Sequence, residues 1–288
     1  MSPGPGWGRP LPAPAKLNLF LRVLGRRDDG YHDIQTVFQL LDYGDELLFH
    51  PRPDGAIVRA AGPAGVASDD DLTVRAARLL RRATGCGQGV EIEIRKRTPL
   101  GGGLGGGSSD AATTLVALNL LWGLGFSRSA LAELGAELGA DVPVFVHGES
   151  AWAEGVGTTL TPVTLPPRCY AVVRPPCSVS TASVFQAPEL TRNSPPMTIC
   201  GFLSNGGGND FLPVVRSRFP AVAAALEWLG RYGEARLTGT GACVFAAFER
   251  LAEAQAVIAA LPAEYEGFAA RGVDRSPLRA AVAELEAG

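Results

Sequence analysis

The sequence predicts an α+β protein of two domains. The chain has 288 residues, about twice the usual domain length of roughly 150. Strand-like alternation and helix-like apolar spacing occur in its first half and recur in its second half. A glycine-rich segment stands between a predicted strand and a predicted helix in the first half. We place the boundary near residue 155, with one domain over 1–155 and another over 156–288.

Composition narrows the class of protein. Hydrophobic residues make up 46% and charged residues 19% of the chain, which favours a globular protein over a disordered one. The formal net charge is −3 and the 26 basic residues are scattered, so we expect no nucleic-acid partner. No apolar run reaches the roughly 20 residues of a membrane helix, so no membrane contact is expected. Residues 1–14, rich in Pro and Gly, are interpreted as a flexible leader.

The five cysteines are far apart in the sequence and do not form the close pairs of a zinc site or a redox dithiol. They are interpreted as reduced thiols. Because residues 1–14 also lack the apolar core of a signal peptide, we expect a cytoplasmic location.

The first strand is predicted from the alternation of Lys16, Asn18 and Phe20 with the leucines between them. In the rest of the first half we expect strands at 34–41, 46–49 and 90–94, a helix at 69–83, and connectors at 25–30 and 42–45. After the glycine-rich segment we expect helices at 110–124, 129–138, 220–229 and 250–261, strands at 170–174, 235–237 and 244–248, and a surface loop at 191–208.

The glycine-rich segment is the strongest functional signal. Six glycines lie between 101 and 107, with Leu104 as the one side chain among them. Glycine permits positive φ and lets backbone amides approach a ligand, and a helix N-terminus adds unsatisfied amides and a positive dipole end. The pattern predicts a phosphate-binding loop, with Ser108 and Ser109 available to cap the helix.

Three other interpretations of this segment are less consistent with its context. A flexible linker does not usually stand between a strand and an amphipathic helix. The segment is not a Walker A loop because no Lys follows its last Gly, and no acidic residue follows at the distance expected for a dinucleotide site.

Several motifs resemble those of a known family and occur in its order. They are Pro14-Ala-Lys-Leu-Asn-Leu19, Pro99 to Ser109, Gly139-Ala-Asp-Val-Pro143 and Leu237-Thr-Gly-Thr-Gly-Ala-Cys243. Together they resemble the GHMP kinase superfamily. Gly30-Tyr-His-Asp-Ile-Gln-Thr36 and Leu41-Asp-Tyr-Gly-Asp45 resemble its bacterial and plastid branch, which serves the non-mevalonate isoprenoid pathway and whose substrate carries a cytidine diphosphate group.

The resemblance implies the fold and the activity. It implies an N-terminal domain like ribosomal protein S5, a ferredoxin-like C-terminal domain, and an active site between them. It also implies transfer of the γ-phosphoryl group of ATP, with Mg²⁺, to a hydroxyl of the cytidyl substrate. No protein side chain is assigned as a metal ligand, and whether Ser108, Ser109 or Asp110 contacts Mg²⁺ is left open. The oligomeric state, monomer or homodimer, is also left open.

The resemblance further implies the roles of individual residues. Asp141 would be the general base and Lys16 would keep it ionised. ATP would be bound by Lys96 and by the loop residues Pro99, Leu100, Gly101, Gly102, Gly103, Leu104, Gly105, Gly106, Gly107, Ser108 and Ser109. The cytidyl substrate would be bound by Asn18, Tyr31, His32, Val156, Thr181 and Phe185, with Tyr31 and Phe185 stacking on the cytosine.

Two alternatives remain. A related kinase would act on mevalonate, homoserine or a sugar, and the Gly-Tyr-His segment argues against that. A non-catalytic nucleotide sensor would keep the loop and lose the chemistry, and the presence of both Lys16 and Asp141 argues against that.

Overall fold

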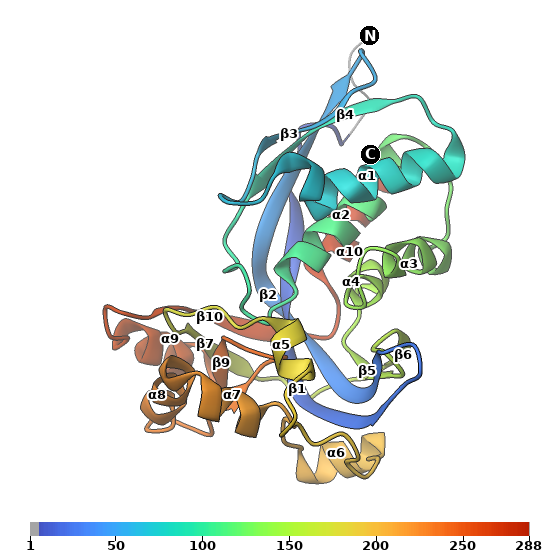
Figure 1. The fold of residues 1–288 in the computed structure, drawn as a ribbon. Coiled ribbons are helices and arrows are strands. Elements are labelled where there is room, and N and C mark those ends of the chain that lie inside the picture. Colours follow the sequence, from blue (N-terminus) through green and yellow to red (C-terminus); the bar gives the residue numbers. More distant parts are fainter. Residues whose placement is uncertain (1–5, 288) are drawn as a thin grey trace.

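The computed structural model describes residues 6–287, which form a ten-stranded mixed sheet with helices packed against it (Figure 1). The strands are β1 (Leu11–Arg26), β2 (His32–Arg52), β3 (Ile57–Ala61), β4 (Gly89–Arg95), β5 (Ala151–Glu154), β6 (Thr159–Pro162), β7 (Cys169–Arg174), β8 (Arg236–Leu237), β9 (Val244–Phe248) and β10 (Glu266–Val273). The mixture of helix and sheet in both halves confirms the predicted α+β class.

Helices fill the connections between these strands. After a short 3-10 turn at Ser68–Asp70 they are α1 (Leu72–Thr84), α2 (Gly106–Leu121), α3 (Arg128–Ala136), α4 (Val142–His147), α5 (Thr181–Phe185), α6 (Ile199–Asn205), α7 (Leu212–Arg218), α8 (Pro220–Leu229), α9 (Leu251–Ala259) and α10 (Pro277–Ala287). Within 6–287 no helix combines the length and apolar character needed to cross a membrane.

Strand β2 organises the sheet because it is 21 residues long. One of its edges pairs with β1, and its remaining pairing partners, β5, β10 and β4, follow one another along its length. The expected connector at 42–45 is therefore wrong. Asp42 and Asp45 lie within the strand, where their carboxylates accept hydrogen bonds from the backbone amides of Arg271 and Arg97. The local sequence indicated a turn at these two acidic residues because the amides that their carboxylates bind are far away in the chain.

The expected flexible leader is wrong for the part of it that the structure describes. Leu11 to Pro14 belong to β1 and pair with β2, and Leu11 and Ala13 are buried. Pro12 and Pro14 are two residues apart, so both lack an amide hydrogen on the same edge of the strand. An edge strand that pairs on one side tolerates proline on the other. The first five residues lie outside the described residues.

The first half forms a layer of helices over one face of the sheet (Figure 1). Helix α1 begins at Asp71, whose side chain accepts from the Thr73 amide, and ends at Gly85 in the left-handed conformation. These are the ends that the sequence pattern favours. Helix α10, which no sequence pattern predicted, inserts Leu278 and Val282 into the same hydrophobic core.

The second half has the strand and helix order of a ferredoxin-like unit. Strands β10, β7, β9 and β8 lie side by side in that order and pair antiparallel, while α8 and α9 pack against β7 and β9. The expected strands at 170–174, 235–237 and 244–248 and helices at 220–229 and 250–261 are confirmed within two residues. Strand β10 also pairs with β2, so one sheet continues through both halves.

The expected surface loop at 191–208 contains helix α6. Its Phe202 is buried and stacks on Phe20, with ring centroids 5.0 Å apart. Thr198 caps the helix by accepting from the Gly201 amide. The Pro, Ser, Asn and Gly content of the segment concealed a helix that burial of one aromatic ring stabilises.

The two halves share buried contacts. Leu21 and Val23 of β1 belong to the core of the second half, and α10 belongs to the core of the first. Another cluster joins Leu17 to Leu104 and to Phe245 of β9. The division near residue 155 stays a prediction, because both ends of the chain contribute to cores on the other side of it.

Candidate active site

The glycine-rich loop follows β4 and leads directly into α2. Gly103 and Gly105 have φ angles of 74° and 70°. A Cβ on Gly103 would lie 2.4 Å from the carbonyl oxygen of Thr238, and one on Gly105 would lie 2.8 Å from the ring of Phe145. Backbone conformation and lack of space therefore both require glycine at these positions, and the linker interpretation is wrong.

Helix α2 begins at Gly106, four residues before the expected Asp110. Its N-cap residue is Gly105, which has no side chain, so the expected capping by Ser108 and Ser109 is wrong; both serines lie within the first turns. Glycine has low helix propensity, which hid this start from the sequence pattern. With no acidic residue in the first turn, the free amides there offer a site for an anion.

A second glycine-rich turn, Thr238–Ala242, lies beside the loop, and backbone hydrogen bonds join the two segments. The Ala242 amide donates to the Gly101 carbonyl at 3.3 Å. The Cys243 amide donates to the Gly102 carbonyl at 3.2 Å. The turn therefore fixes the backbone of the loop.

Lys16 lies on β1, where its backbone amide donates to the carbonyl of Leu104 at 3.0 Å. Its side chain is buried, and its ammonium donates to the Asn18 side-chain oxygen at 2.5 Å. Asn18 in turn donates to the Thr36 hydroxyl at 2.9 Å. Asn18, expected to contact substrate, is 3% exposed, so in this structure its side chain orients Lys16.

Asp141 faces Lys16 across the site, with Oδ2 3.3 Å from Nζ. The Asp141 side chain is 34% exposed and that of Lys16 is 4% exposed. Asp141 is the N-cap residue of α4 but forms no capping hydrogen bond, which leaves its carboxylate for other partners. Pro143 occupies the first turn of α4, where its missing amide proton costs nothing.

Lys96 lies at the end of β4 between two carboxylates. Its Nζ donates to Asp45 at 2.7 Å and to Asp110 at 2.6 Å. Asp45 also accepts from the amides of Arg97 and Thr98 at 2.6 and 2.7 Å. The cluster anchors the segment that precedes the loop, and sequence reasoning missed Asp45 because its partners are about fifty residues away.

Asp110 is the less satisfied carboxylate of this cluster. It is 3% exposed, and its Oδ1 has no hydrogen-bond partner among the described residues. Burial, with a smaller contribution from the nearby Asp45 charge, outweighs Lys96 and raises the Asp110 pKa to about 7. One ammonium thus donates to two carboxylates.

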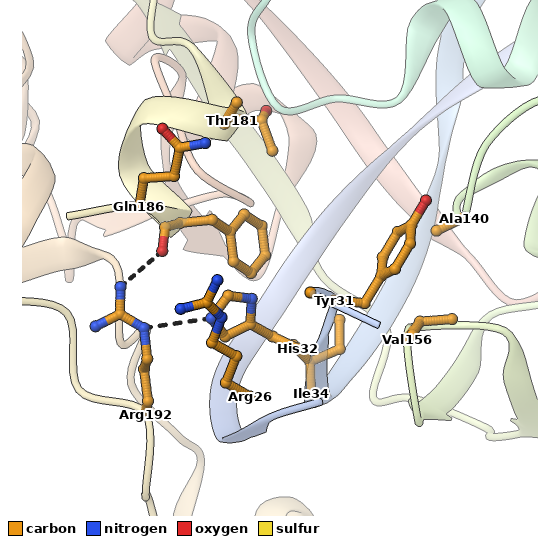
Figure 2. A pocket seen from close by; sticks show the side chains of 12 residues that line it. Arg26, Tyr31, His32, Ile34, Ala140, Val156, Thr181, Gln186 and Arg192 are labelled. Atoms are coloured by element: carbon orange, nitrogen blue, oxygen red, sulfur yellow. Dashed lines mark hydrogen bonds between the residues drawn. The ribbon is translucent and has the colours of Figure 1, made fainter. Parts of the chain in front are cut away.

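A cavity of about 670 Å³ is lined by residues from both halves of the chain. Figure 2 shows its lining, to which the first half contributes Tyr31 and His32 and the second half Val156 and Thr181. Five of the six expected substrate-binding residues border this cavity: Tyr31, His32, Val156, Thr181 and Phe185. Ala140, the residue that precedes Asp141 in the chain, also lines it.

Both halves of the chain contribute aromatic side chains to the cavity. Tyr31 is 64% exposed. Phe185 packs against His32, with ring centroids 5.0 Å apart, and edge-on against Phe211. Packing therefore fixes the Phe185 ring, while the exposed Tyr31 ring is available to a ligand.

Sequence reasoning missed Arg26, Gln186 and Arg192, which also line the cavity. Arg192 donates to His32 Nε2 at 3.3 Å (Figure 2). An isolated arginine in a segment rich in Ser, Pro and Asn carries no pattern that would identify it, because its partners become neighbours when the chain folds.

The described residues contain no cluster of His, Cys, Asp or Glu side chains able to hold a metal ion. The Ser108 hydroxyl is half-buried in the first turn of α2 and lies 3.7 Å from where a Cβ of Gly139 would be. Ser109 is fully buried. Of these two hydroxyl groups, only that of Ser108 is therefore accessible to a ligand at the start of α2.

Comparison with known proteins agrees with this geometry. Residues 71–149 match the model of the GHMP kinases N terminal domain, and residues 192–267 match that of the GHMP kinases C terminal domain. A solved structure described as mevalonate kinase shares 13% identity with a TM-score of 0.68, covering 93% of this chain and 100% of that one, which shows the shared fold. The two matched segments together cover more than half of the chain, so the chain is a GHMP-type kinase.

Two further comparisons define the family. The 4-diphosphocytidyl-2-C-methyl-D-erythritol kinase of Halorhodospira halophila is 59% identical over 276 residues, which cover 95% of this chain and 96% of the relative. The crystal structure of a 4-(cytidine 5'-diphospho)-2C-methyl-D-erythritol kinase is 34% identical with a TM-score of 0.80, covering 92% of this chain and 100% of that one. The chain belongs to the 4-diphosphocytidyl-2-C-methyl-D-erythritol kinase family.

Proposed function

We propose that this chain transfers the terminal phosphoryl group of ATP to the 2-hydroxyl of 4-diphosphocytidyl-2-C-methyl-D-erythritol, a step of the non-mevalonate isoprenoid pathway. One observation carries the proposal: the Lys16–Asp141 pair is close to both the N-terminus of α2 and the cavity. A Cβ on Gly105, the N-cap residue of α2, would lie 3.2 Å from Cε of Lys16, and Ala140, which precedes Asp141 in the chain, lines the cavity with Tyr31 and His32. An anion site, a carboxylate and a substrate-sized cavity thus adjoin one another.

Asp141 acts as the general base in this proposal. Its carboxylate is the partly exposed member of the pair, and it accepts the proton of the attacking hydroxyl. Lys16 is held in place by Asn18. Its positive charge offsets the negative charge that develops on the reacting oxygens.

The loop from Pro99 to Ser109 binds the phosphates of ATP through backbone amides. Its glycines leave these amides uncovered, and the first turn of α2 contributes amides without intrahelical acceptors. Lys96, which was expected to contact ATP directly, is held by Asp45 and Asp110. Its contribution is to position the start of the loop.

Mg²⁺ accompanies ATP in this proposal, with Ser108 as the side chain that would hold it beside the phosphates. When bound, the ion neutralises charge on the transferred phosphoryl group. A cytoplasmic location and the choice between monomer and homodimer stay predictions.

The direct test measures ATP consumption with three acceptors: the cytidyl substrate, 2-C-methyl-D-erythritol 4-phosphate and mevalonate. Binding of the base supplies energy that orients the reacting hydroxyl, so removing the cytidyl group should lower both kcat and affinity. We expect the cytidyl substrate to exceed both others by about a hundredfold or more in kcat/KM. Equal turnover of the acceptor without the cytidyl group would contradict the proposal.

A further inference from the structure

Arg192 is fixed by four hydrogen bonds at the edge of the cavity. Its Nη2 donates to the carbonyls of Phe185 and Ala187, both at 2.7 Å, and its Nη1 donates to the carbonyl of Leu190 at 3.1 Å. Its Nε donates to Nε2 of His32 at 3.3 Å (Figure 2). Three carbonyls thus hold the guanidinium in one orientation while its Nε–H contacts the histidine.

The contact determines where His32 carries its proton. A guanidinium has donors only, so Nε2 of His32 must be the acceptor. A neutral imidazole that accepts at Nε2 has its hydrogen on Nδ1. Arg192 therefore favours the Nδ1–H tautomer.

The surroundings of His32 also disfavour its charged form. Burial, followed by the positive charges of Arg192 and Arg26, lowers the His32 pKa. Both arginines line the cavity with His32. The neutral ring is therefore favoured, with one face packed near Phe185 and its Nε2 accepting from Arg192. Nδ1–H is then the polar group that the ring offers to a ligand.

We propose that Arg192 is a positioning residue that fixes His32 as its Nδ1–H tautomer, so that the cavity selects a cytosine base over a uracil base. This inference rests on the proposed function. The N3 atom of cytosine is a hydrogen-bond acceptor and matches the Nδ1–H donor. The N3 atom of uracil carries a hydrogen, so the same edge would place donor against donor and leave a buried group unpaired.

The first experiment observes the tautomer directly in the full chain without substrate. The chain has three histidines, so ¹⁵N-histidine labelling gives few signals, and the spectrum of a His32→Asn variant identifies the signals of His32. We expect the wild-type ring at pH 7.5 to be neutral and protonated on Nδ1. A ring protonated on Nε2, or a charged ring, would overturn the proposal.

The second experiment tests Arg192 by substitution. Arg192→Met removes the donors at similar length, and Arg192→Lys restores a donor and the positive charge. Arg218→Met is the matched control. Arg218 donates two hydrogen bonds, at 2.5 and 2.7 Å, to Glu189, which lies three residues before Arg192 in the chain. In Arg192→Met we expect His32 to gain the Nε2–H form, while Arg218→Met keeps the wild-type signals. An unchanged His32 tautomer in Arg192→Met would show that Arg192 does not set it.

The kinetic consequence is measured as the ratio of kcat/KM for the cytidyl substrate to kcat/KM for its uridyl analogue. We expect the wild type to favour the cytidyl compound at least about tenfold, Arg192→Met to lose most of that preference, and Arg192→Lys to recover part of it. A preference unchanged in Arg192→Met would contradict the specificity role. Failure of the wild type to use either compound would instead contradict the proposed function, and the tautomer result would still stand.

Discussion

Asp141 and Lys16 illustrate how neighbours set the role of a residue. The lysine is buried and the aspartate is partly exposed, so the charged partner is fixed while the carboxylate stays accessible to a hydroxyl. We expect Asp141→Asn to lower kcat by about 10²- to 10⁴-fold, the usual contribution of a general base. Affinity for ATP should change little, because loop amides hold the phosphates.

Glu137→Gln is a suitable control for this variant, since Glu137 is an exposed carboxylate shortly before Asp141 in the chain. Steady-state kinetics and a nucleotide-binding titration check both parts of the prediction. Near wild-type kcat in Asp141→Asn would show that the base is another group. Loss of ATP affinity instead would identify Asp141 as a nucleotide or metal ligand.

Asp110 gives a pH-dependent prediction. Its folded pKa is about 7, above the ordinary value of 3.8, so the folded state binds the proton more tightly than the unfolded state does. The stability that this group contributes is complete below pH 3.8 and is lost as pH rises through 7. Asp110→Asn removes this loss. We expect it to raise the free energy of unfolding at pH 8 by roughly 1–3 kcal/mol relative to wild type, and by less at pH 5.

Denaturant unfolding at both pH values measures this difference, with Asp69→Asn as the control because the Asp69 side chain is 78% exposed. A variant less stable than wild type at pH 8 would mean that the ionised Asp110–Lys96 pair dominates over the cost of burying the carboxylate.

At the scale of elements, the loop and α2 form one unit in which glycine is needed for shape. Gly105→Val would place a branched side chain at φ 70° against Phe145 and Lys16, which distorts the backbone that faces phosphate. We expect the KM for ATP to rise at least about tenfold. Gly123→Val is the matched control, because Gly123 has φ 66° just beyond the other end of α2 and a Cβ there would have no contact within 4 Å.

Both glycine variants carry backbone strain, so both should lose some thermal stability, and nucleotide kinetics should separate them. An equal effect of the two variants on the KM for ATP would mean that strain in α2, and not the geometry of the loop, controls nucleotide binding. Gly106 needs glycine for a different reason: it is helical, and a Cβ there would collide with the hydroxyl of Thr98.

At the scale of the whole molecule, the cavity exists because the two halves meet. Tyr31 comes from the turn between β1 and β2, and Phe185 from α5. If one base stacks on both rings, Tyr31→Ala and Phe185→Ala should each cost about 1–3 kcal/mol in kcat/KM for the cytidyl substrate and leave the KM for ATP unchanged. The double variant should lose less than the sum of the single losses.

A double-mutant cycle with the cytidyl substrate measures this coupling. Tyr232→Ala is the control, because Tyr232 is an exposed aromatic residue that packs on Trp228 and does not line the cavity. Fully additive losses would show that the two rings do not act on one base.

The sequence by itself determined the local parts of this protein. Periodicity identified most strands and longer helices, and the glycines between 101 and 107 predicted an anion site, because these signals arise from neighbouring residues. The motifs around Lys16, Tyr31 and Asp141 indicated a family that the comparisons confirm. Only the tertiary structure decided what each group contacts. The Asp45–Lys96–Asp110 cluster, the return of α10 to the first core and the Arg192–His32 contact join residues far apart in the chain. Hydrogen bonds and burial between such residues depend on the folded geometry, which leaves no periodic trace in the sequence.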